Sequence, residues 1–153
     1  MKPPVAYDTL AAEWSKDAPW DQLNPDMAMA QIPNLHAKYV HVLTYHNLLL
    51  KKNKLDYAQK KKFKTEYFSG ELNNPEDLAK YKLEPFLTKV GDKTNKMDMW
   101  LAADEDLAKL QMKQAVNEEI VSFCTLVIKE LNARTYQING LIKYRVYMKG
   151  NDS

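Results

Sequence analysis

The hydrophobic positions of this chain recur at spacings of three and four residues, which is the period of an α-helix rather than of a strand. Near the beginning, Leu10 and Trp14 are four residues apart and predict a first helix over roughly residues 7–17. Pro19 cannot continue this helix and is expected to end it. The pattern is therefore helical from its first element.

A much longer helical pattern extends from Met27 to Gly70. Asn24 and Pro25 precede it as an N-cap and a proline at the first helical position. Pro33 lies inside the pattern, where we expect a kink or a restart of the helix. Beyond Pro33 the spacing alternates between four and three, as in a helix that packs along another helix. These positions are Leu35, Tyr39, Val42, His46 and Leu49.

Residues 71–97 are the least regular part of the sequence. Residues 73–77, with two asparagines, a proline and two acidic residues, predict the start of a short helix that reaches about Leu83, before Pro85. The polar stretch 90–96 is typical of an exposed loop. We therefore interpret 71–97 as a loop region that holds one short helix.

The last long helix is predicted from about Ala103 to Met148, a span that contains no proline and, at Gly140, one glycine. Two apolar lines lie side by side along it and make a wider surface than a two-stranded seam needs. We expect this stripe to be too long for a monomer of 153 residues to bury, which favours self-association. The predicted subunit interface consists of Val121, Cys124, Ile128, Leu131, Ile138 and Ile142.

The composition fits an all-α protein and narrows the expected compartment. Hydrophobic residues make up 45% and charged residues 27% of the chain, and only four residues are glycine. Because Cys124 is the one cysteine, no intrachain disulfide can form, and a reducing compartment is favoured. No apolar run approaches the ~20 residues that span a bilayer, and the first residues lack the apolar core of a secretory signal. We expect a cytoplasmic protein without a membrane partner.

The charge is unevenly distributed, although the formal net charge is only +2. Residues 36–70 contain eight lysines against Asp56 and Glu66, a local balance of +6. In the stretch 51–68, seven of these lysines are interleaved with four aromatic residues. Ammonium groups bind phosphates and aromatic faces stack unpaired bases, so the stretch is a candidate site for single-stranded nucleic acid. The candidate residues are Lys51, Lys52, Lys54, Tyr57, Lys60, Lys61, Lys62, Lys64 and Phe68.

One face of the predicted helix could combine the stacking of bases with phosphate contacts. Its residues are Tyr57, Lys61, Lys64 and Phe68. The alternative interpretation is a solvated lysine face whose aromatic residues belong to the core. The pattern alone does not separate the two.

No constellation for catalysis or for metal or cofactor binding is found in the sequence. His36, His41 and His46 are spaced five apart, whereas two metal ligands on one helix face need a spacing of three or four. Cys124 lies on the apolar seam, where a buried inert thiol is expected. No phosphate loop, dinucleotide glycine pattern or nucleophile elbow occurs. The sequence predicts a protein that is not an enzyme and that needs no cofactor and no metal.

The basic stretch and its end, Tyr67-Phe68-Ser69-Gly70, resemble the UvsY family of recombination mediators from T-even-like phages. That family carries a Tyr-Tyr-Ser-Gly element directly after a basic helix. The resemblance extends over about residues 14–148, and its main departure is the longer segment 71–97. Further collinear matches are Ser15 to Asp17 with Asp21, Leu101 to Asp106, Phe123 with Cys124, and Ala133 to Tyr136.

The resemblance implies a ring-forming hexamer or heptamer that binds single-stranded DNA. Such mediators help a phage RecA-like recombinase to load onto strands coated by the phage single-stranded DNA-binding protein, in the infected bacterial host. The family's basic pair that affects DNA binding falls on Lys62 and Lys64. Two residues of separation turn a helix by about 200°, so both side chains cannot face one flat surface.

The resulting interpretation divides the chain into two regions. Residues 1–97 form an N-terminal helical DNA-binding region, with the basic helix at 34–69 and the loop at 71–97, and residues 98–153 form the C-terminal oligomerisation helix. The alternative is a non-catalytic helical scaffold or assembly factor that binds protein and not DNA. A membrane-surface helix is less favoured, because the lysines lack a continuous opposing apolar face.

Overall fold

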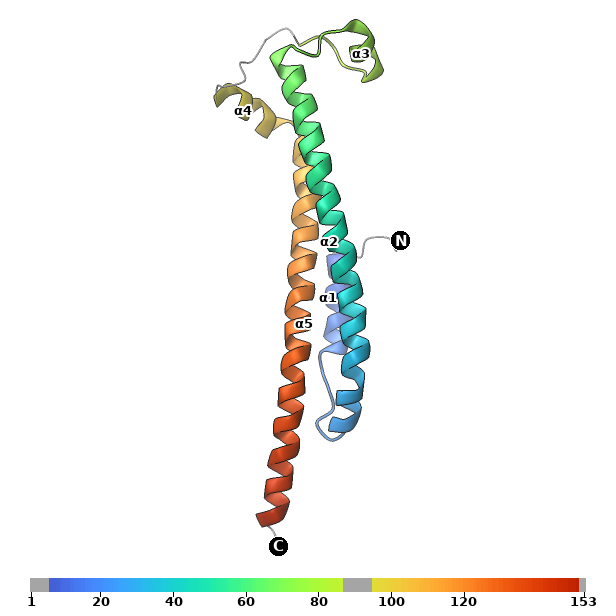
Figure 1. The fold of residues 1–153 in the computed structure, drawn as a ribbon, viewed down its shortest axis with the longest axis vertical. Coiled ribbons are helices and arrows are strands. Elements are labelled where there is room, and N and C mark those ends of the chain that lie inside the picture. The colour runs from blue at the N-terminus through green and yellow to red at the C-terminus, as the bar shows by residue number, and fades with distance from the viewer. Residues whose placement is uncertain (1–5, 87–94, 152–153) are drawn as a thin grey trace. The chain divides into compact units, whose positions relative to one another are not determined.

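The computed structural model describes residues 6–86 and 95–151, and its secondary structure in these ranges is entirely helical (Figure 1). The prediction of an all-α protein with a short first helix and an extended last helix is confirmed. The helices are α1 (Tyr7–Asp17), α2 (Pro25–Ser69), α3 (Pro75–Lys80), α4 (Asn95–Ala103) and α5 (Glu105–Asn151).

The chain divides into two compact units, and α2 and α5 each contribute to both. Met1–Leu49 and Val116–Ser153 form the first unit, and Leu50–Ala115 forms the second. This division does not follow the predicted boundary between residues 97 and 98, because each long helix is shared. The assignment of DNA binding to 1–97 and of oligomerisation to 98–153 stays a prediction.

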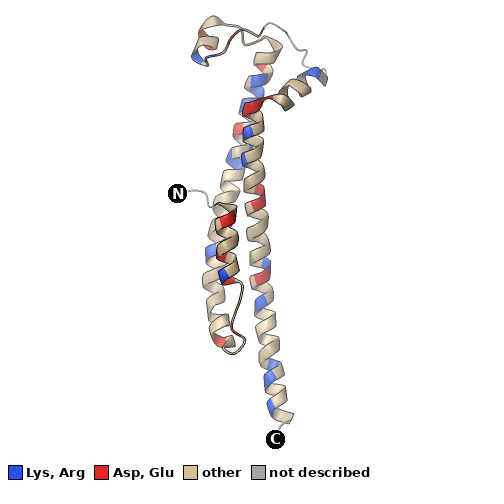
Figure 2. Ribbon diagram, turned by 180° about the vertical axis from the view of Figure 1, so that it is seen from behind, with Lys and Arg blue, Asp and Glu red and all other residues tan. Residues whose placement is uncertain are grey.

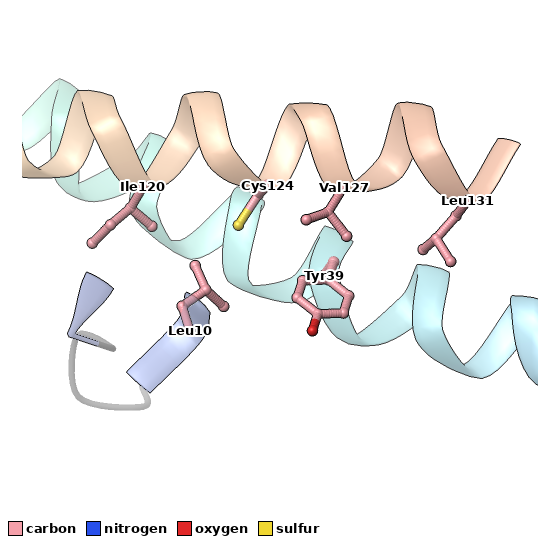
Figure 3. Close-up of a cluster of buried hydrophobic side chains, with 6 residues drawn as sticks. All are labelled: Leu10, Tyr39, Ile120, Cys124, Val127 and Leu131. Carbon is pink, nitrogen blue, oxygen red and sulfur yellow. The ribbon is translucent and has the colours of Figure 1, made fainter. Parts of the chain in front are cut away.

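The core of the first unit forms where α1, α2 and α5 bury their apolar faces together. Figure 3 shows four side chains of α5 pointing toward Leu10 of α1 and Tyr39 of α2. This arrangement confirms the predicted seam of α2, in which Tyr39 is fully buried and Leu35 and Val42 pack beside it. The buried members of the cluster are Leu10, Tyr39, Ile120, Cys124, Val127 and Leu131.

A buried arginine holds the end of α1. Arg134 is 4% exposed, and its Nη2 donates to the carbonyl oxygens of Asp17 at 3.3 Å and Ala18 at 2.6 Å. The last carbonyls of a helix have no partner within the helix, so this guanidinium supplies the donors that they need. It also lies 5.9 Å from the centre of the Trp14 ring. The short helix α1 is therefore fixed by polar as well as apolar contacts.

The Asp17 carboxylate joins α1 to α2. It accepts hydrogen bonds from Lys38 Nζ at 2.7 Å and from Tyr39 Oη at 2.9 Å. Burial alone raises the pKa of Asp17, but the hydrogen bonds from Lys38 and Tyr39 outweigh burial and hold this pKa below its ordinary value. Asp17 is thus charged at neutral pH and keeps the buried Tyr39 hydroxyl paired.

A histidine and an asparagine form a polar contact between α2 and α5 in the same unit. His46 is fully buried, and its Nδ1 lies 2.8 Å from the side-chain oxygen of Asn117. His46 is on the predicted α2 seam, and Asn117 comes from α5. The two long helices therefore meet here through a specific pair.

Helix α2 continues through Pro33 without a restart, so that alternative of the prediction was wrong. Pro33 is exposed, and buried residues lie on both sides of it, Ala28 before and Tyr39 after. A proline inside a helix removes one backbone hydrogen bond, but the packing of the flanking turns keeps the segment helical.

The segment between the long helices differs from the prediction in two ways. Helix α3 begins as predicted, with the Asn74 side chain accepting from the Glu76 backbone N–H, but it ends at Lys80 rather than near Leu83. Helix α4 was not predicted as a separate element. The polar stretch predicted as a loop at 90–96 lies largely outside the described residues.

The residues predicted as the subunit interface are partly covered by their own chain. Cys124, Leu131 and Ile138 are fully buried within the chain, and the other three are half-buried: Val121, Ile128 and Ile142. The expectation that a monomer leaves this stripe uncovered was wrong for its middle part, because α1 and α2 pack on it. A subunit interface at these residues stays a prediction.

Replacing Leu131 by alanine should lower the free energy of unfolding by about 2–5 kcal/mol, because the side chain is fully buried. Leu23→Ala is the matched control, since Leu23 is 82% exposed and its truncation should change stability by less than about 0.5 kcal/mol. Urea unfolding followed by circular dichroism measures both variants. Equal effects of the two substitutions would contradict the described core.

Candidate nucleic-acid interface

The candidate site lies in the second unit, on the frame formed by the end of α2, helix α4 and the start of α5. Its core buries Phe68, Met97, Leu101 and Leu107, with three further aromatic residues packed against them: Tyr57, Tyr67 and Phe86. Met97 and Leu101 are four residues apart, and this spacing is the sequence signal that could have predicted α4.

Five of the seven candidate lysines point into solvent. These are Lys51, Lys52, Lys54, Lys61 and Lys62, all exposed on α2. Figure 2 shows basic residues gathered along the part of α2 that belongs to the second unit. Phosphate groups bind ammonium groups that water can reach, so these five residues present the accessible positive charge of the segment.

The other two lysines are paired with acidic residues near the start of α5. Lys64 is 8% exposed, and its Nζ lies 3.1 Å from Asp104 Oδ1 and 3.0 Å from Asp106 Oδ2. Lys60 Nζ lies 3.8 Å from the same Asp106 oxygen. Burial lowers the pKa of the Lys64 ammonium, but its hydrogen bonds to Asp106 and Asp104 outweigh burial, so the pKa is above its ordinary value.

Asp104 also begins α5. Its Oδ2 accepts a hydrogen bond from the Leu107 backbone N–H at 3.0 Å, as an N-cap residue does, while its Oδ1 contacts Lys64. One carboxylate therefore satisfies a free N–H at the start of a helix and neutralises a buried lysine.

The two candidate aromatic residues are engaged inside the unit. The Tyr57 hydroxyl accepts a hydrogen bond from Gln111 Nε2 at 3.1 Å. Phe68 is 6% exposed and packs against Phe86 and Trp100, with ring centres 5.2 Å and 5.7 Å apart. A direct stacking role for Tyr57 and Phe68 stays a prediction, and in this structure both rings contact protein.

The predicted stripe of Tyr57, Lys61, Lys64 and Phe68 therefore lies mostly against the chain itself. Lys61 is its one exposed member. The same geometry separates Lys62, which is exposed, from Lys64, which is buried, as expected for two positions about 200° apart on a helix.

One aromatic pair at the basic segment was not selected as a candidate from the sequence. Phe63 of α2 and Tyr81, which follows α3, have ring centres 4.8 Å apart. They border a cavity of about 370 Å³, which is also lined by Asp56, Gln59, Lys60 and Leu110. Tyr81 was missed because it lies outside the basic segment, at the end of the predicted short helix.

The described residues hold no metal-binding cluster, no reactive thiol and no membrane-spanning helix. They contain no group of three or more His, Cys, Asp or Glu side chains that could hold a metal ion. Burial raises the pKa of the Cys124 thiol to about 11, so this thiol is protonated at neutral pH and is a poor nucleophile. None of the helices, over the ranges described, is long and apolar enough to cross a membrane.

The fold and the site define an all-helical protein whose distinctive surface is a row of accessible lysines on a long helix. A family model described as "Recombination, repair and ssDNA binding protein UvsY" matches residues 13–151. The chain belongs to this family, as the resemblance predicted, and the family supports a general role in recombination and single-stranded DNA binding.

Two crystal structures of the bacteriophage T4 recombination mediator protein UvsY share the fold. The lattice type II structure matches with a TM-score of 0.76 and 16% identity, over 95% of this chain and 98% of that chain. The lattice type I structure matches with a TM-score of 0.74 and 17% identity, over 91% and 98%. No curated protein matches the sequence.

The Lys64 cluster predicts a specific pH dependence. The hydrogen bond from Lys64 holds the pKa of Asp106 below its ordinary value of 3.8. A carboxylate with a lowered pKa in the folded state stabilises that state above its unfolded pKa, and the gain is lost as pH falls through the folded pKa. The loss of unfolding free energy caused by Asp106→Asn should therefore be present at neutral pH and shrink below pH 3.8.

Urea unfolding at a series of pH values measures this difference. Lys64→Met provides the matched background, because without the ammonium group the Asp106→Asn substitution should have a smaller effect that depends less on pH. An Asp106→Asn effect that is the same in both backgrounds at every pH would contradict the ion cluster.

Proposed function

We propose that this protein is a non-catalytic recombination mediator that binds single-stranded DNA through the exposed lysines of α2. The observation that carries the proposal is the separation of the basic segment into two sets. Lys60 and Lys64 are paired with acidic residues, whereas Lys51, Lys52, Lys54, Lys61 and Lys62 face solvent. Ordinary core packing does not require five exposed lysines within twelve residues, and a phosphate backbone does use them.

The finer role concerns protein partners. We propose that the protein helps a RecA-like recombinase to load onto strands coated by a single-stranded DNA-binding protein. Family membership supports this role. Several weak sites that bind one strand together gain avidity, and they can bend the strand and weaken the hold of the resident protein. Assembly of this kind needs no bond chemistry.

We assign a structural role to four of the candidate residues: Tyr57, Lys60, Lys64 and Phe68. Their contacts with α5 and with neighbouring aromatic residues hold the basic part of α2 in position. A direct contact between these residues and DNA requires them to leave those partners. We therefore assign the first contact with the strand to the five exposed lysines.

We also propose that the chain self-associates through α5, in a hexamer or heptamer. Large apolar side chains remain exposed on the part of α5 in the first unit, and surfaces of this kind mark protein interfaces. Leu126 and Tyr144 lie on one face, about five turns apart. The exposed set is Val116, Leu126, Tyr136, Tyr144, Val146, Tyr147 and Met148.

The DNA-binding proposal predicts that Lys51→Ala combined with Lys62→Ala weakens binding to a labelled oligo-dT strand. Each lost phosphate contact should reduce the log–log salt slope by about 0.7. Fluorescence anisotropy across a salt titration measures affinity and slope, with duplex of equal length for comparison. Lys113→Ala with Lys129→Ala, two exposed lysines of α5, is the charge-matched control and should bind as wild type does.

The same variants separate DNA binding from recombinase loading. The Lys51, Lys62 variant should fail to stimulate the recombinase on coated strands, while the control variant should stimulate it. If the wild-type protein binds no single-stranded DNA at low salt, the proposal is overturned and a protein-binding scaffold is favoured instead.

The self-association proposal predicts that Leu126→Asp with Tyr144→Asp lowers the mass measured by light scattering. Both side chains are exposed in the single chain, at 62% and 60%, so the substitutions should leave its fold intact. Asn132→Asp, another exposed change on α5 that adds a negative charge, is the control. An unchanged mass for the double variant would exclude these two residues from the interface.

A further inference from the structure

We propose that the cavity beside Phe63 and Tyr81 is a stacking site for one unpaired base of the bound strand. This inference rests on the proposed binding of single-stranded DNA and names a site for it. The cavity has a volume of about 370 Å³ and is open at the surface of the second unit, and Lys60 of the basic segment is among its lining residues. It brings together α2, the residue after α3 and the start of α5.

The two rings leave a flat surface for a planar ligand. Phe63 and Tyr81 meet edge to face, with ring planes inclined by 63°, so they do not cover each other by stacking. Tyr81 is 49% exposed although it is a large aromatic residue. A base that enters the cavity can therefore lie on the Tyr81 ring, and stacking of this kind accepts every base.

The charges around the rings fit a nucleotide rather than an apolar ligand. Lys60 Nζ lies 5.2 Å from the centre of the Phe63 ring, and Lys80 Nζ lies 5.6 Å from the centre of the Tyr81 ring. Lys80 is exposed, so its ammonium group is available to a phosphate beside an inserted base.

The cavity lining favours a base over a phosphate, because its one lysine, Lys60, is paired with Asp106. The Asp56 carboxylate only accepts hydrogen bonds and repels a phosphate group, whereas it can accept from an amino or imino group of a base. The Gln59 amide both donates and accepts, so it can meet the edge of any base. The arrangement therefore places the base inside and leaves the backbone outside, where Lys80 is exposed.

Tyr81 is held in place from both sides of its segment. It follows directly after α3, where the Leu83 backbone N–H donates to the Leu78 carbonyl at 2.8 Å and closes the turn. Lys82 adopts a left-handed backbone conformation with φ of 55° in this turn. Farther along, the Tyr67 hydroxyl donates to the Glu84 carbonyl at 2.6 Å and ties the segment to α2. The backbone that carries the ring is thus positioned before a ligand arrives.

The test compares two labelled strands of equal length, oligo-dT and a strand of the same phosphate backbone without bases. In the full-length protein, Tyr81→Leu should weaken binding to oligo-dT about fivefold or more and leave binding to the abasic strand unchanged. The salt slope should not change, because no phosphate contact is lost. Tyr81→Phe keeps the ring and should bind both strands as wild type does. Circular dichroism checks the helix content of each variant.

A second measurement locates the base directly. A strand that carries 5-iododeoxyuridine should crosslink on irradiation to the peptides that contain Phe63 and Tyr81, and Tyr81→Leu should reduce this crosslink.

Each other outcome overturns the inference in a distinguishable way. Unchanged oligo-dT binding by Tyr81→Leu would exclude the stacking site and leave the proposed function intact. Equal weakening on both strands would assign Tyr81 to the support of the fold instead. Failure of wild type to bind either strand would overturn the proposed function and this site with it.

Discussion

The contact of Lys64 with Asp104 and Asp106 is the interaction on which the candidate site depends. Through this contact, the face of α2 that carries Lys64 packs against α5. Because successive helical residues are rotated by about 100°, Lys61 and Lys62 then point into solvent. A buried ammonium group is costly unless it is paired, so the position of these two carboxylates fixes the rotation of α2 about its own axis. The aromatic core around Phe68 lies on the same inner side and reinforces this rotation.

This arrangement gives lysines in one short segment two kinds of role. Lys64 contributes to the fold because its charge is neutralised within the unit, while Lys62, two residues earlier, contributes accessible charge. Net charge is therefore a poor guide to the binding surface of this protein. Asp104 supports the fold in two ways, because it caps the start of α5 and also neutralises the buried Lys64.

Much of the fold followed from the sequence because helical periodicity is a local property. The bounds of α1 were predicted from the spacing of Leu10 and Trp14 and from Pro19, and the seam through Tyr39 and His46 was predicted from spacing alone. The continuity of α2 through Pro33 could not be predicted from the sequence, because it depends on the packing of the residues on both sides of the proline. Helix α4 was missed because one pair of apolar residues, Met97 and Leu101, is a weak signal, and their packing against Phe68 is visible only in the structure.

The site was predicted as a segment but not as a surface. Composition identified the lysines of 51–64, yet the direction of each side chain depends on partners in α5 that are distant in the sequence. The role of Tyr81 could not be predicted for the same reason, because its contact with Phe63 joins α2 to a segment without a regular pattern. The apolar residues of α5 were assigned to an interface because the covering helices α1 and α2 could not be placed from sequence.

The buried pair of His46 and Asn117 has a consequence for the pairing of the long helices in the first unit. An apolar seam with spacings of three and four fits its partner almost equally well after a slip of seven residues, so apolar contacts alone define the register poorly. A slip of this kind would separate His46 from Asn117, and each side chain would lose its hydrogen bond to the other. The pair therefore allows one alignment of α2 and α5 in this unit and penalises the others, and the seam gains a unique register from a single polar contact.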